Sequence, residues 1–319
     1  MKKKYTVLII PAGSGMAIAA IQMLKNVENI ATITADVNPL APGLYLADKS
    51  YIIPSFDDNT FEDKLQSLIQ KENIDVIIPA LDTILHYFSK HKKQFETLGV
   101  KILISDEQTI QITRDKWETY QKLKDRIPIP KSFKSTKDIN IPFPLFIKPR
   151  DGSGSINAYK INNNKELIFY SKKVTNPIIQ EYLSGKEYTV DCLTDMKGKL
   201  LLSITRVRLE TKAGISVKGK IIHNEKLNYM AQQITNYLSF QGPFFFQAIE
   251  DDNGIPKLTE INARISGTMS LSSSSGVNIH KLAIQSLMGE QITIPKIKTN
   301  LYVSRYWKDI VLTENEFIQ

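Results

Sequence analysis

Short apolar runs alternate with segments of helical periodicity along the first hundred residues, and this alternation constrains the fold more than any other feature. The apolar runs are candidate strands, at residues 5–10, 31–36, 51–54, 75–80 and 100–105. Strands separated by helices predict a parallel, doubly wound α/β sheet. Ligands bind such sheets at the carboxyl ends of the strands, where Asp36 and Asp82 fall.

The sequence changes in character after residue 105. Residues 106–126 predict one helix, because Trp117, Tyr120 and Leu123 recur at intervals of three. Beyond it, apolar strands follow one another through short turns, and helices are expected only near residues 225–240 and 278–289. This second part of the chain therefore predicts an α+β arrangement with mostly antiparallel strands.

Composition narrows the class of protein. With 42% hydrophobic and 23% charged residues, the chain is typical of a globular protein. The 41 basic and 33 acidic residues leave a net charge of +8 that is spread along the chain. A lysine-rich solvated surface explains this charge, and binding of a small polyanion such as a nucleotide fits equally well. No basic stripe with interleaved aromatics is present, so nucleic acid is not an expected partner.

Several classes of site and location are excluded or disfavoured. Cys192 is the only cysteine, which excludes an intramolecular disulfide, and it is expected in the core. The four histidines show no metal-ligand spacing. The first apolar run, residues 7–10, is too short for a signal peptide or a membrane span. We therefore expect a cytoplasmic protein that does not enter a membrane.

Asn253-Gly254 predicts a two-residue hairpin turn, because alternating apolar residues flank it. A turn centred there places Gln247 directly opposite Glu260. Asn262 and Arg264 follow on the same face through the period of two. A bulge of one residue in either strand would break this pairing.

The predicted face carries a carboxylate, two amides and a guanidinium. Hard cations such as Mg²⁺ prefer oxygen ligands and often bridge to phosphates, and an arginine beside them can bind a phosphate oxygen. The pattern alone is equally consistent with the solvated face of an edge hairpin.

Two glycine-serine segments invite a nucleotide-binding interpretation. In FIKPRDGSGS, Lys148 ends an apolar strand and a glycine loop follows, whose backbone could approach phosphates. A Walker loop has its lysine after the glycines, so this loop is expected to be a flap between antiparallel strands, unless it is an ordinary hairpin loop. The other segment, 13–15, has Ile18 where a dinucleotide fingerprint needs glycine. A glycine turn near some ligand and a plain tight turn remain alternatives there.

Together these motifs resemble the ATP-grasp superfamily, and within it single-grasp proteins similar to half of the carbamoyl-phosphate synthase large subunit. The resemblance covers nearly the whole chain. It implies an α/β pre-ATP-grasp domain at 1–108, a small ATP-grasp subdomain with the glycine-rich loop at 109–180, and a large subdomain with the metal-binding hairpin at 181–319.

The resemblance also implies a role for each matching residue. Two lysines and a glycine-serine loop would contact the ATP phosphates, residues 180–183 would contact adenine, and Glu187 would bind the ribose hydroxyls. The expected nucleotide-binding residues are Lys116, Lys148, Gly152, Ser153, Gly154, Gln180, Glu181, Tyr182, Leu183 and Glu187. The expected metal ligands are Gln247, Glu260 and Asn262.

The substrate side is less defined by the sequence. Arg206 and Arg208 share one strand face ahead of an expected loop that contains Lys212 and Lys218. Arg208 is predicted to bind substrate or phosphate, and to act in catalysis with Lys148 and Arg264. The serine-rich stretch 266–275 predicts either an anion-binding loop or a helix cap.

The implied activity is that of an ATP-dependent carbon–nitrogen ligase. It would activate a carboxylate as an acyl phosphate for attack by an amine or another nucleophile, releasing ADP and phosphate. The expected cofactors are ATP and one or two Mg²⁺ ions, with Mn²⁺ as an alternative. The expected partners are small carboxylates and amines, and the family indicates a homodimer. A non-catalytic ATP sensor is the alternative. Carbamoyl phosphate synthesis by this chain alone is not expected, because one grasp unit is present and the synthase has two.

Overall fold

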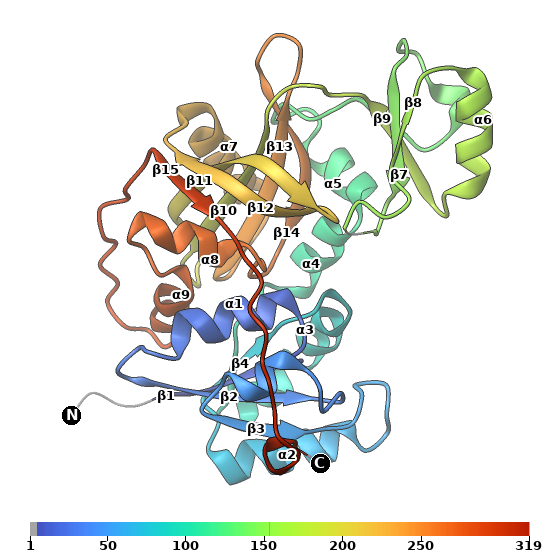
Figure 1. Cartoon of the computed structure of the whole chain (residues 1–319). Coiled ribbons are helices and arrows are strands. Elements are labelled where there is room, and N and C mark those ends of the chain that lie inside the picture. Colours follow the sequence, from blue (N-terminus) through green and yellow to red (C-terminus); the bar gives the residue numbers. More distant parts are fainter. Residues whose placement is uncertain (1–4, 153, 319) are drawn as a thin grey trace.

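The computed structural model describes residues 5–152 and 154–318 of the 319-residue chain. The described chain forms a five-stranded, a four-stranded and a six-stranded sheet. In Figure 1 the five-stranded sheet lies at the bottom, the six-stranded sheet lies above it, and the four-stranded sheet stands apart at the upper right.

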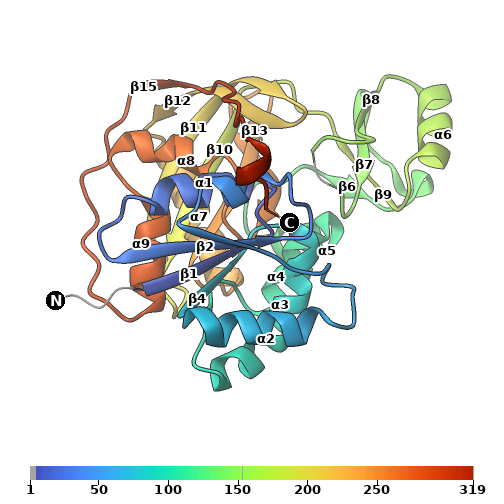
Figure 2. The same cartoon turned by 60° about the horizontal axis from the view of Figure 1, so that its bottom comes forward.

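The five-stranded sheet is parallel throughout, with the order β3-β2-β1-β4-β5. Its strands are β1 (Tyr5–Ile10), β2 (Ile30–Asp36), β3 (Lys49–Ile52), β4 (Val76–Pro79) and β5 (Lys101–Ile102). The connecting helices are α1 (Gly15–Leu24), α2 (Phe61–Glu72) and α3 (Asp82–Thr97), and η1 (Pro42–Tyr45) is a short 3₁₀ turn. Figure 2 shows α1 and α2 on opposite faces of the sheet, which confirms the predicted doubly wound α/β arrangement.

The prediction of a single helix over residues 106–126 is wrong, because the helix is interrupted at Asp115. The two pieces are α4 (Glu107–Arg114) and α5 (Lys116–Leu123). Asp115 has extended backbone angles, and its carboxylate accepts a hydrogen bond from the Trp117 backbone nitrogen at 2.9 Å. An aspartate can cap a new helix in this way more favourably than it continues an old one. The break places Lys116 at the first position of α5.

The four-stranded sheet is antiparallel and has its own apolar core. Its order is β6-β9-β7-β8, with β6 (Ser132–Phe133), β7 (Leu145–Pro149), β8 (Tyr159–Ile161) and β9 (Pro177–Glu181). Helix α6 (Asn164–Lys173) packs against it, and η2 (Thr136–Asp138) precedes β7. Buried Leu145, Ile147 and Leu167 belong to a cluster that includes no residue of the other two sheets.

The six-stranded sheet is antiparallel at every pairing, as predicted, in the order β14-β13-β10-β11-β12-β15. Its strands are β10 (Glu187–Thr194), β11 (Leu200–Lys212), β12 (Ile215–Ile222), β13 (Pro243–Glu250), β14 (Pro256–Asn262) and β15 (Leu301–Ser304). The accompanying helices are α7 (Glu225–Tyr237), α8 (Met269–Ser272), η3 (Ser273–Ser275) and α9 (Ile279–Leu287). Cys192 is fully buried in this part, as predicted.

The parallel sheet and the six-stranded sheet share their cores. One large cluster of buried apolar residues contains Leu8 and Phe246, and a second contains Ile9 and Ile204. After β15 the chain runs back across the molecule to η4 (Glu314–Glu316), and Ile318 packs near Ala12 (Figure 1). The two sheets are therefore held together both by side-chain packing and by this C-terminal segment, residues 305–318.

Candidate active site

The hairpin of β13 and β14 turns through three residues, and the predicted two-residue turn is wrong. The Asp251 backbone nitrogen donates to the Ile255 carbonyl oxygen at 2.9 Å, and the Gly254 nitrogen donates to the Asp251 carbonyl oxygen at 2.9 Å. Gly254 has φ +70°, as the last residue of a three-residue hairpin loop requires. The Asp251 carboxylate favours this turn by accepting from the Asn253 and Ile255 backbone nitrogens, each at 3.0 Å.

Gln247 nevertheless pairs with Glu260, as predicted. The three-residue turn by itself would shift the pairing by one position. A bulge in β14 offsets this shift, because Gln247 pairs with Glu260 whereas its neighbour Ala248 pairs with Leu258, which leaves Thr259 as the extra residue. A bulge was expected to break the pairing of Gln247 with Glu260, but in combination with the longer turn it restores that pairing.

Three side chains with oxygen atoms lie together on the polar face of the hairpin: Gln247, Glu260 and Asn262. The Asn262 amide nitrogen donates to Glu260 Oε1 at 2.8 Å, and Gln247 lies opposite on β13. Among the described residues no group of three or more His, Cys, Asp or Glu side chains could hold a metal ion. With a single carboxylate, a hard cation at Glu260 would complete its shell with oxygens from outside the protein.

A cavity of about 320 Å³ lies between the small sheet and this hairpin. It brings together the predicted nucleotide-binding residues that the structure describes, except Gly154, with two of the three predicted metal ligands. The residues concerned are Lys116, Lys148, Gly152, Gln180, Glu181, Tyr182, Leu183, Glu187, Gln247 and Glu260. Gly154 lines a neighbouring cavity of about 240 Å³, and Ser153 lies outside the described residues.

Lys148 ends near the hairpin bulge. Its ammonium donates to the Thr259 carbonyl oxygen at 3.1 Å. Burial and repulsion by the Lys116 ammonium lower the pKa of Lys148 to about 8, although Glu260 and Glu187 oppose the shift. Such a cation gains more than an exposed lysine would from a phosphate placed beside it.

Lys116 ties the glycine loop to the start of α5. Its ammonium donates to the Gly152 carbonyl oxygen at 2.6 Å and to the Arg150 carbonyl oxygen at 3.3 Å. Arg150 in turn pairs with Asp115, the residue at which the predicted helix breaks, at 2.5 Å. The loop continues through Gly154 toward β8 and lies against Gly214, where an added Cβ would come within 2.8 Å of the Gly154 carbonyl carbon.

Arg264 is engaged by the N-terminal part of the chain. Its Nε donates to Asp82 Oδ1 at 2.5 Å and its Nη2 to Asp82 Oδ2 at 2.8 Å. Asp82 begins α3 at the end of β4, where the sequence predicts ligand-binding side chains. Both residues line a further cavity, of about 390 Å³, together with Glu260 and Asn262. A phosphate bound by Arg264 would share its guanidinium with Asp82.

The two arginines of β11 have different surroundings. Arg208 lines the 240 Å³ cavity, donates to the Gly214 carbonyl oxygen at 2.6 Å and lies 3.3 Å from Glu187, while burial lowers its pKa. Arg206 is fully buried and pairs with Asp191 at 2.9 Å. Arg206 therefore differs from Arg208, because its charge is already neutralised inside the protein.

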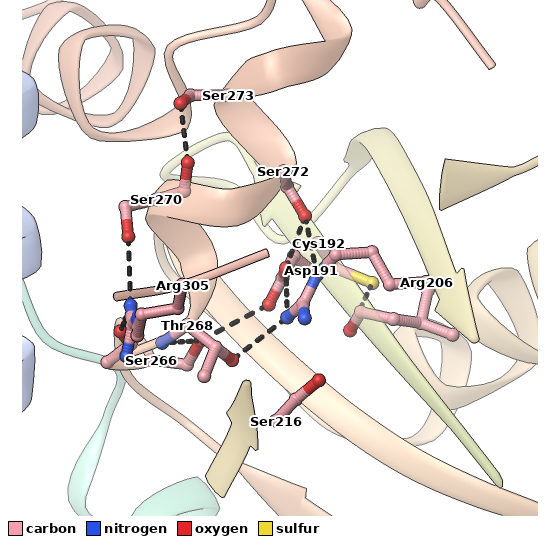
Figure 3. Close-up of polar contacts among 12 residues, drawn as sticks. Asp191, Cys192, Arg206, Ser216, Ser266, Thr268, Ser270, Ser272, Ser273 and Arg305 are labelled. Atoms are coloured by element: carbon pink, nitrogen blue, oxygen red, sulfur yellow. Dashed lines mark hydrogen bonds and ion pairs between the residues drawn. The ribbon is translucent and has the colours of Figure 1, made fainter. Parts of the chain in front are cut away.

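Residues 266–275 begin beside the 240 Å³ cavity and are held by buried hydrogen bonds. Ser266 and Ser272 donate to the buried Asp191 carboxylate, at 3.3 Å and 2.5 Å, and Thr268 accepts from Arg206 at 2.9 Å (Figure 3). The stretch is thereby fixed against the sheet. Lys218, expected in a loop, lies in β12.

The Gly13–Gly15 turn is used mainly by the fold. Gly13 donates its backbone hydrogen to Asp36 Oδ2 at 2.8 Å, and Ser14 caps α1 by accepting from the Ala17 nitrogen at 3.0 Å. Gly15 lines the 240 Å³ cavity. The polar groups of Gly13 and Ser14 are thus used within the protein, whereas Gly15 borders a cavity.

The sequence predicted no role for Arg305, Asp191 or Thr189, although residues 305–309 resemble the ATP-grasp proteins. Arg305 and Thr189 line the 240 Å³ cavity, and Asp191 lies fully buried beside it. Arg305 follows the edge strand β15, far along the chain from the hairpin, so no local spacing connects it with Glu260.

Comparison with known protein families accounts for this arrangement. Residues 153–308 match the family of ATP-grasp proteins in the biosynthetic pathway with the Ter operon, and residues 7–103 match the PylC-like N-terminal domain. Residues 153–308 are therefore similar to ATP-grasp proteins. The chain is also similar to part of the carbamoyl phosphate synthase large chain.

Two named relatives illustrate the extent of the similarity. The D-alanine–D-alanine ligase of Petrotoga mobilis is 29% identical over 197 residues, which are 52% of this chain and 65% of the relative. The carbamoyl phosphate synthase large chain of Thermoanaerobacter sp. is 28% identical over 234 residues, 66% of this chain and 21% of the relative. The chain thus matches less than two thirds of either relative.

The ATP-grasp fold is also evident from solved structures. The biotin carboxylase domain of Hydrogenobacter thermophilus 2-oxoglutarate carboxylase, solved with magnesium ADP, ADP and bicarbonate, has a TM-score of 0.74 and 17% identity. The similarity covers 95% of this chain and 74% of that domain. Within residues 5–152 and 154–318, no helix is long and apolar enough to cross a membrane.

Proposed function

We propose that the protein is an ATP-dependent ligase that joins a carboxylate to an amine through an acyl phosphate. The observation that carries this proposal is the position of Glu260, which lines the 320 Å³ cavity and both of its neighbours. A nucleotide phosphate in the first cavity and a carboxylate in a neighbouring one would therefore meet at Glu260. Gln247 and Lys148 lie beside this junction.

In this proposal ATP lies in the 320 Å³ cavity. Residues 180–183 would contact adenine and Glu187 the ribose hydroxyls, while Lys116, Lys148 and the loop at Gly152 would surround the phosphates. One or two Mg²⁺ ions would be held by Glu260, Gln247 and Asn262 together with phosphate oxygens, and would neutralise phosphate charge during transfer. Mn²⁺ would satisfy the same oxygen ligands.

The reaction would proceed in two displacements. An oxygen of the substrate carboxylate attacks the γ-phosphorus, the bond to the bridging oxygen breaks, and ADP leaves with that electron pair. The amine then attacks the acyl carbon, its carbon–nitrogen bond forms, inorganic phosphate departs, and the amine loses a proton. Such phosphoryl transfer depends chiefly on positioning and charge stabilisation, which Lys148 and Arg264 would supply, with Arg208 on the substrate side.

A carboxylate-dependent ADP-release assay tests this proposal. The protein is incubated with magnesium ATP, a pool of carboxylic acids and a pool of amines, and ADP is quantified. We expect release that requires an acid and disappears in Glu260→Ala. The matched control is Glu225→Ala, an exposed carboxylate at the start of α7. Tight ATP binding without acid-dependent turnover across the pools contradicts the ligase and favours a nucleotide sensor.

The finer organisation belongs to the same proposal. Of the proposed division into domains at 1–108, 109–180 and 181–319, the separate apolar core of the four-stranded sheet supports only the part near residues 132–181. Ile110, Leu123 and Ile127 pack in the large cluster with the other two sheets. Assembly as a homodimer rests on the family resemblance, and light scattering coupled to gel filtration tests it.

A further inference from the structure

The 240 Å³ cavity has an excess of positive charge. The described residues that line it contribute the guanidinium groups of Arg208, Arg264 and Arg305 and a single carboxylate, that of Glu260. Arg208 and Arg264 each have an acidic partner, Glu187 and Asp82. Among the residues that the structure describes, Arg305 has no acidic partner within ion-pair distance.

Arg305 is held firmly although it has no counterion. Its Nη2 donates to the Gly267 carbonyl oxygen at 2.5 Å and to Ser270 Oγ at 3.2 Å (Figure 3). Burial and repulsion from the charge of Arg206 lower its pKa. A half-buried cation that faces a cavity in this way is stabilised by an anion placed beside it.

The segment that binds Arg305 is itself held in place by buried hydrogen bonds. The segment that carries Gly267 and Ser270 is bound to the fully buried Asp191–Arg206 pair through Ser266, Thr268 and Ser272. Figure 3 shows this network beside Arg305. Side chains locked by such contacts hold a binding geometry without reorganisation.

Two further features point to an anion in the same cavity. The amino-terminal end of α1 reaches it through Gly15 and Met16, and a helix amino terminus carries partial positive charge. The cavity also contains the hydroxyl groups of Thr189, Ser216 and Thr268, which can donate to carboxylate oxygens.

Arg305 lies away from the phosphoryl-transfer end of the cavity. Glu260 lines all three cavities, so it stands at their junction, whereas Arg305 lines only the 240 Å³ cavity. An acid whose reacting carboxylate lies beside Arg264 at this junction would therefore extend toward Arg305 with its remaining groups. We propose that Arg305 binds a second carboxylate of the substrate, which makes the acid substrate of this enzyme a small dicarboxylate or an acidic amino acid.

This inference rests on the proposed ligase activity and is tested by removing one charge from the acid. ADP release is measured with pairs that differ only by an amide in place of a carboxylate: glutarate and its monoamide, succinate and its monoamide, glutamate and glutamine, aspartate and asparagine. We expect kcat/KM to be about 10- to 100-fold higher for the dicarboxylate of the preferred pair, since a hydrogen-bonded charge contributes about 1.5–3 kcal/mol.

Variants then assign the preference to Arg305. In Arg305→Gln the preference should disappear through a rise in KM for the dicarboxylate, while KM for ATP stays unchanged. Arg305→Lys should retain part of the preference, because it keeps the charge and loses the fork of donors. Lys308→Gln, an exposed cation on the same C-terminal segment, is the matched control and should keep the full preference.

The outcomes separate the two claims. Release of ADP with equal efficiency from dicarboxylates and their monoamides contradicts the inference and leaves the ligase intact. Retention of the preference in a folded Arg305→Gln protein contradicts the role of Arg305. Absence of release with every acid contradicts the ligase, and the inference fails with it. If Arg305→Gln does not fold, the preference of the unaltered protein still decides whether the substrate is a dicarboxylate.

Discussion

The tripeptide Gly-Ser-Gly occurs twice in this chain, at residues 13–15 and 152–154, and the two copies have different surroundings. The first follows a parallel strand and starts α1, with Gly13 bound to Asp36 and Ser14 used as the helix cap. The second connects antiparallel strands, and its Gly152 lines two cavities. In the first copy the protein itself occupies the groups that a nucleotide would need.

The comparison shows that glycine content does not identify a phosphate site. What distinguishes the second copy is its neighbours: Lys116 donates to the Gly152 carbonyl oxygen, and Lys148 lies near the end of the strand before it. The first copy instead has Asp36 beside it. Its carboxylate accepts a hydrogen bond from the Gly13 backbone nitrogen at 2.8 Å and would repel a phosphate. A phosphate site needs cations and free backbone donors together.

The largest expected effect on nucleotide binding comes from removing the carboxylate of Glu260, which lines the same cavities as Gly152 of the second copy. Glu260→Gln should weaken binding of magnesium ATP by at least about 100-fold, because the carboxylate expected to hold the metal is lost. Isothermal titration calorimetry measures this affinity. Asp36→Ala removes the carboxylate beside the first copy and should leave the affinity unchanged. A larger loss in Asp36→Ala than in Glu260→Gln would reverse the comparison.

A smaller effect is expected from displacing the second copy. Gly214→Ala places a methyl group 2.8 Å from the Gly154 backbone, so the loop must shift and kcat/KM for ATP should fall about 10- to 100-fold. Gly254→Ala is a matched control, because Gly254 also has a positive φ but open space around its Cα. It should lower only stability, by about 1 kcal/mol. Steady-state kinetics with a thermal unfolding control distinguishes the two, and equal kinetic losses would contradict a role for the loop.

The lysine beside the second copy predicts a pH dependence. Lys148, with a pKa of about 8, loses its proton in the free protein above that pH, whereas a bound triphosphate favours the charged form. Nucleotide binding above pH 8 should therefore take up a proton, and the affinity should fall by about tenfold between pH 7 and pH 9. Titration in buffers of different ionisation enthalpy measures this uptake. Lys148→Met should abolish it, and uptake that persists in this variant assigns the proton elsewhere.

The same lysine affects folding with the opposite sign. Because its folded pKa lies below the unfolded value near 10.4, the unfolded state binds more protons between about pH 8 and pH 10.4. This residue alone therefore makes the protein more stable as pH rises through that interval. Chemical denaturation of the wild type and Lys148→Met at pH 8 and pH 10 isolates the contribution.

The smallest functional effect is expected at the first copy. Asp36→Ala leaves the Gly13 and Asn38 backbone nitrogens without their acceptor, and should lower the free energy of unfolding by about 1–3 kcal/mol. Urea denaturation measures this loss, while nucleotide affinity should not change. A loss of affinity in a protein of normal stability would show that the first copy takes part in binding.

Much of the fold and of the hairpin could be predicted from the sequence, because hydrophobic patterns that repeat along the chain identify strands and helices reliably. Alternating strands and helices predicted the parallel sheet, and the Asn253-Gly254 turn with the period of two predicted that Gln247 faces Glu260. The prediction succeeded through two offsetting errors, a longer turn and a bulge at Thr259. Both depend on hydrogen bonds of single residues, which hydrophobic patterns do not report.

Other features depend on contacts between distant segments. The break at Asp115 is stabilised by Arg150, and the partner of Arg264 is Asp82, 182 positions earlier. Arg206 and Arg208 have the same spacing pattern, yet one pairs internally with Asp191 and the other lines a cavity. The two arginines differ in the residues that the register of β11 with β10 places beside them. The sequence pattern of one strand does not contain this information.

The most direct test of the account is a crystal structure of the protein with Mg²⁺ and a non-hydrolysable ATP analogue. We predict adenine against residues 180–183, the phosphates between Lys116, Lys148 and the loop at Gly152, and the metal at Glu260. A nucleotide bound at the Gly13–Gly15 turn, with Glu260 free of metal, would contradict it.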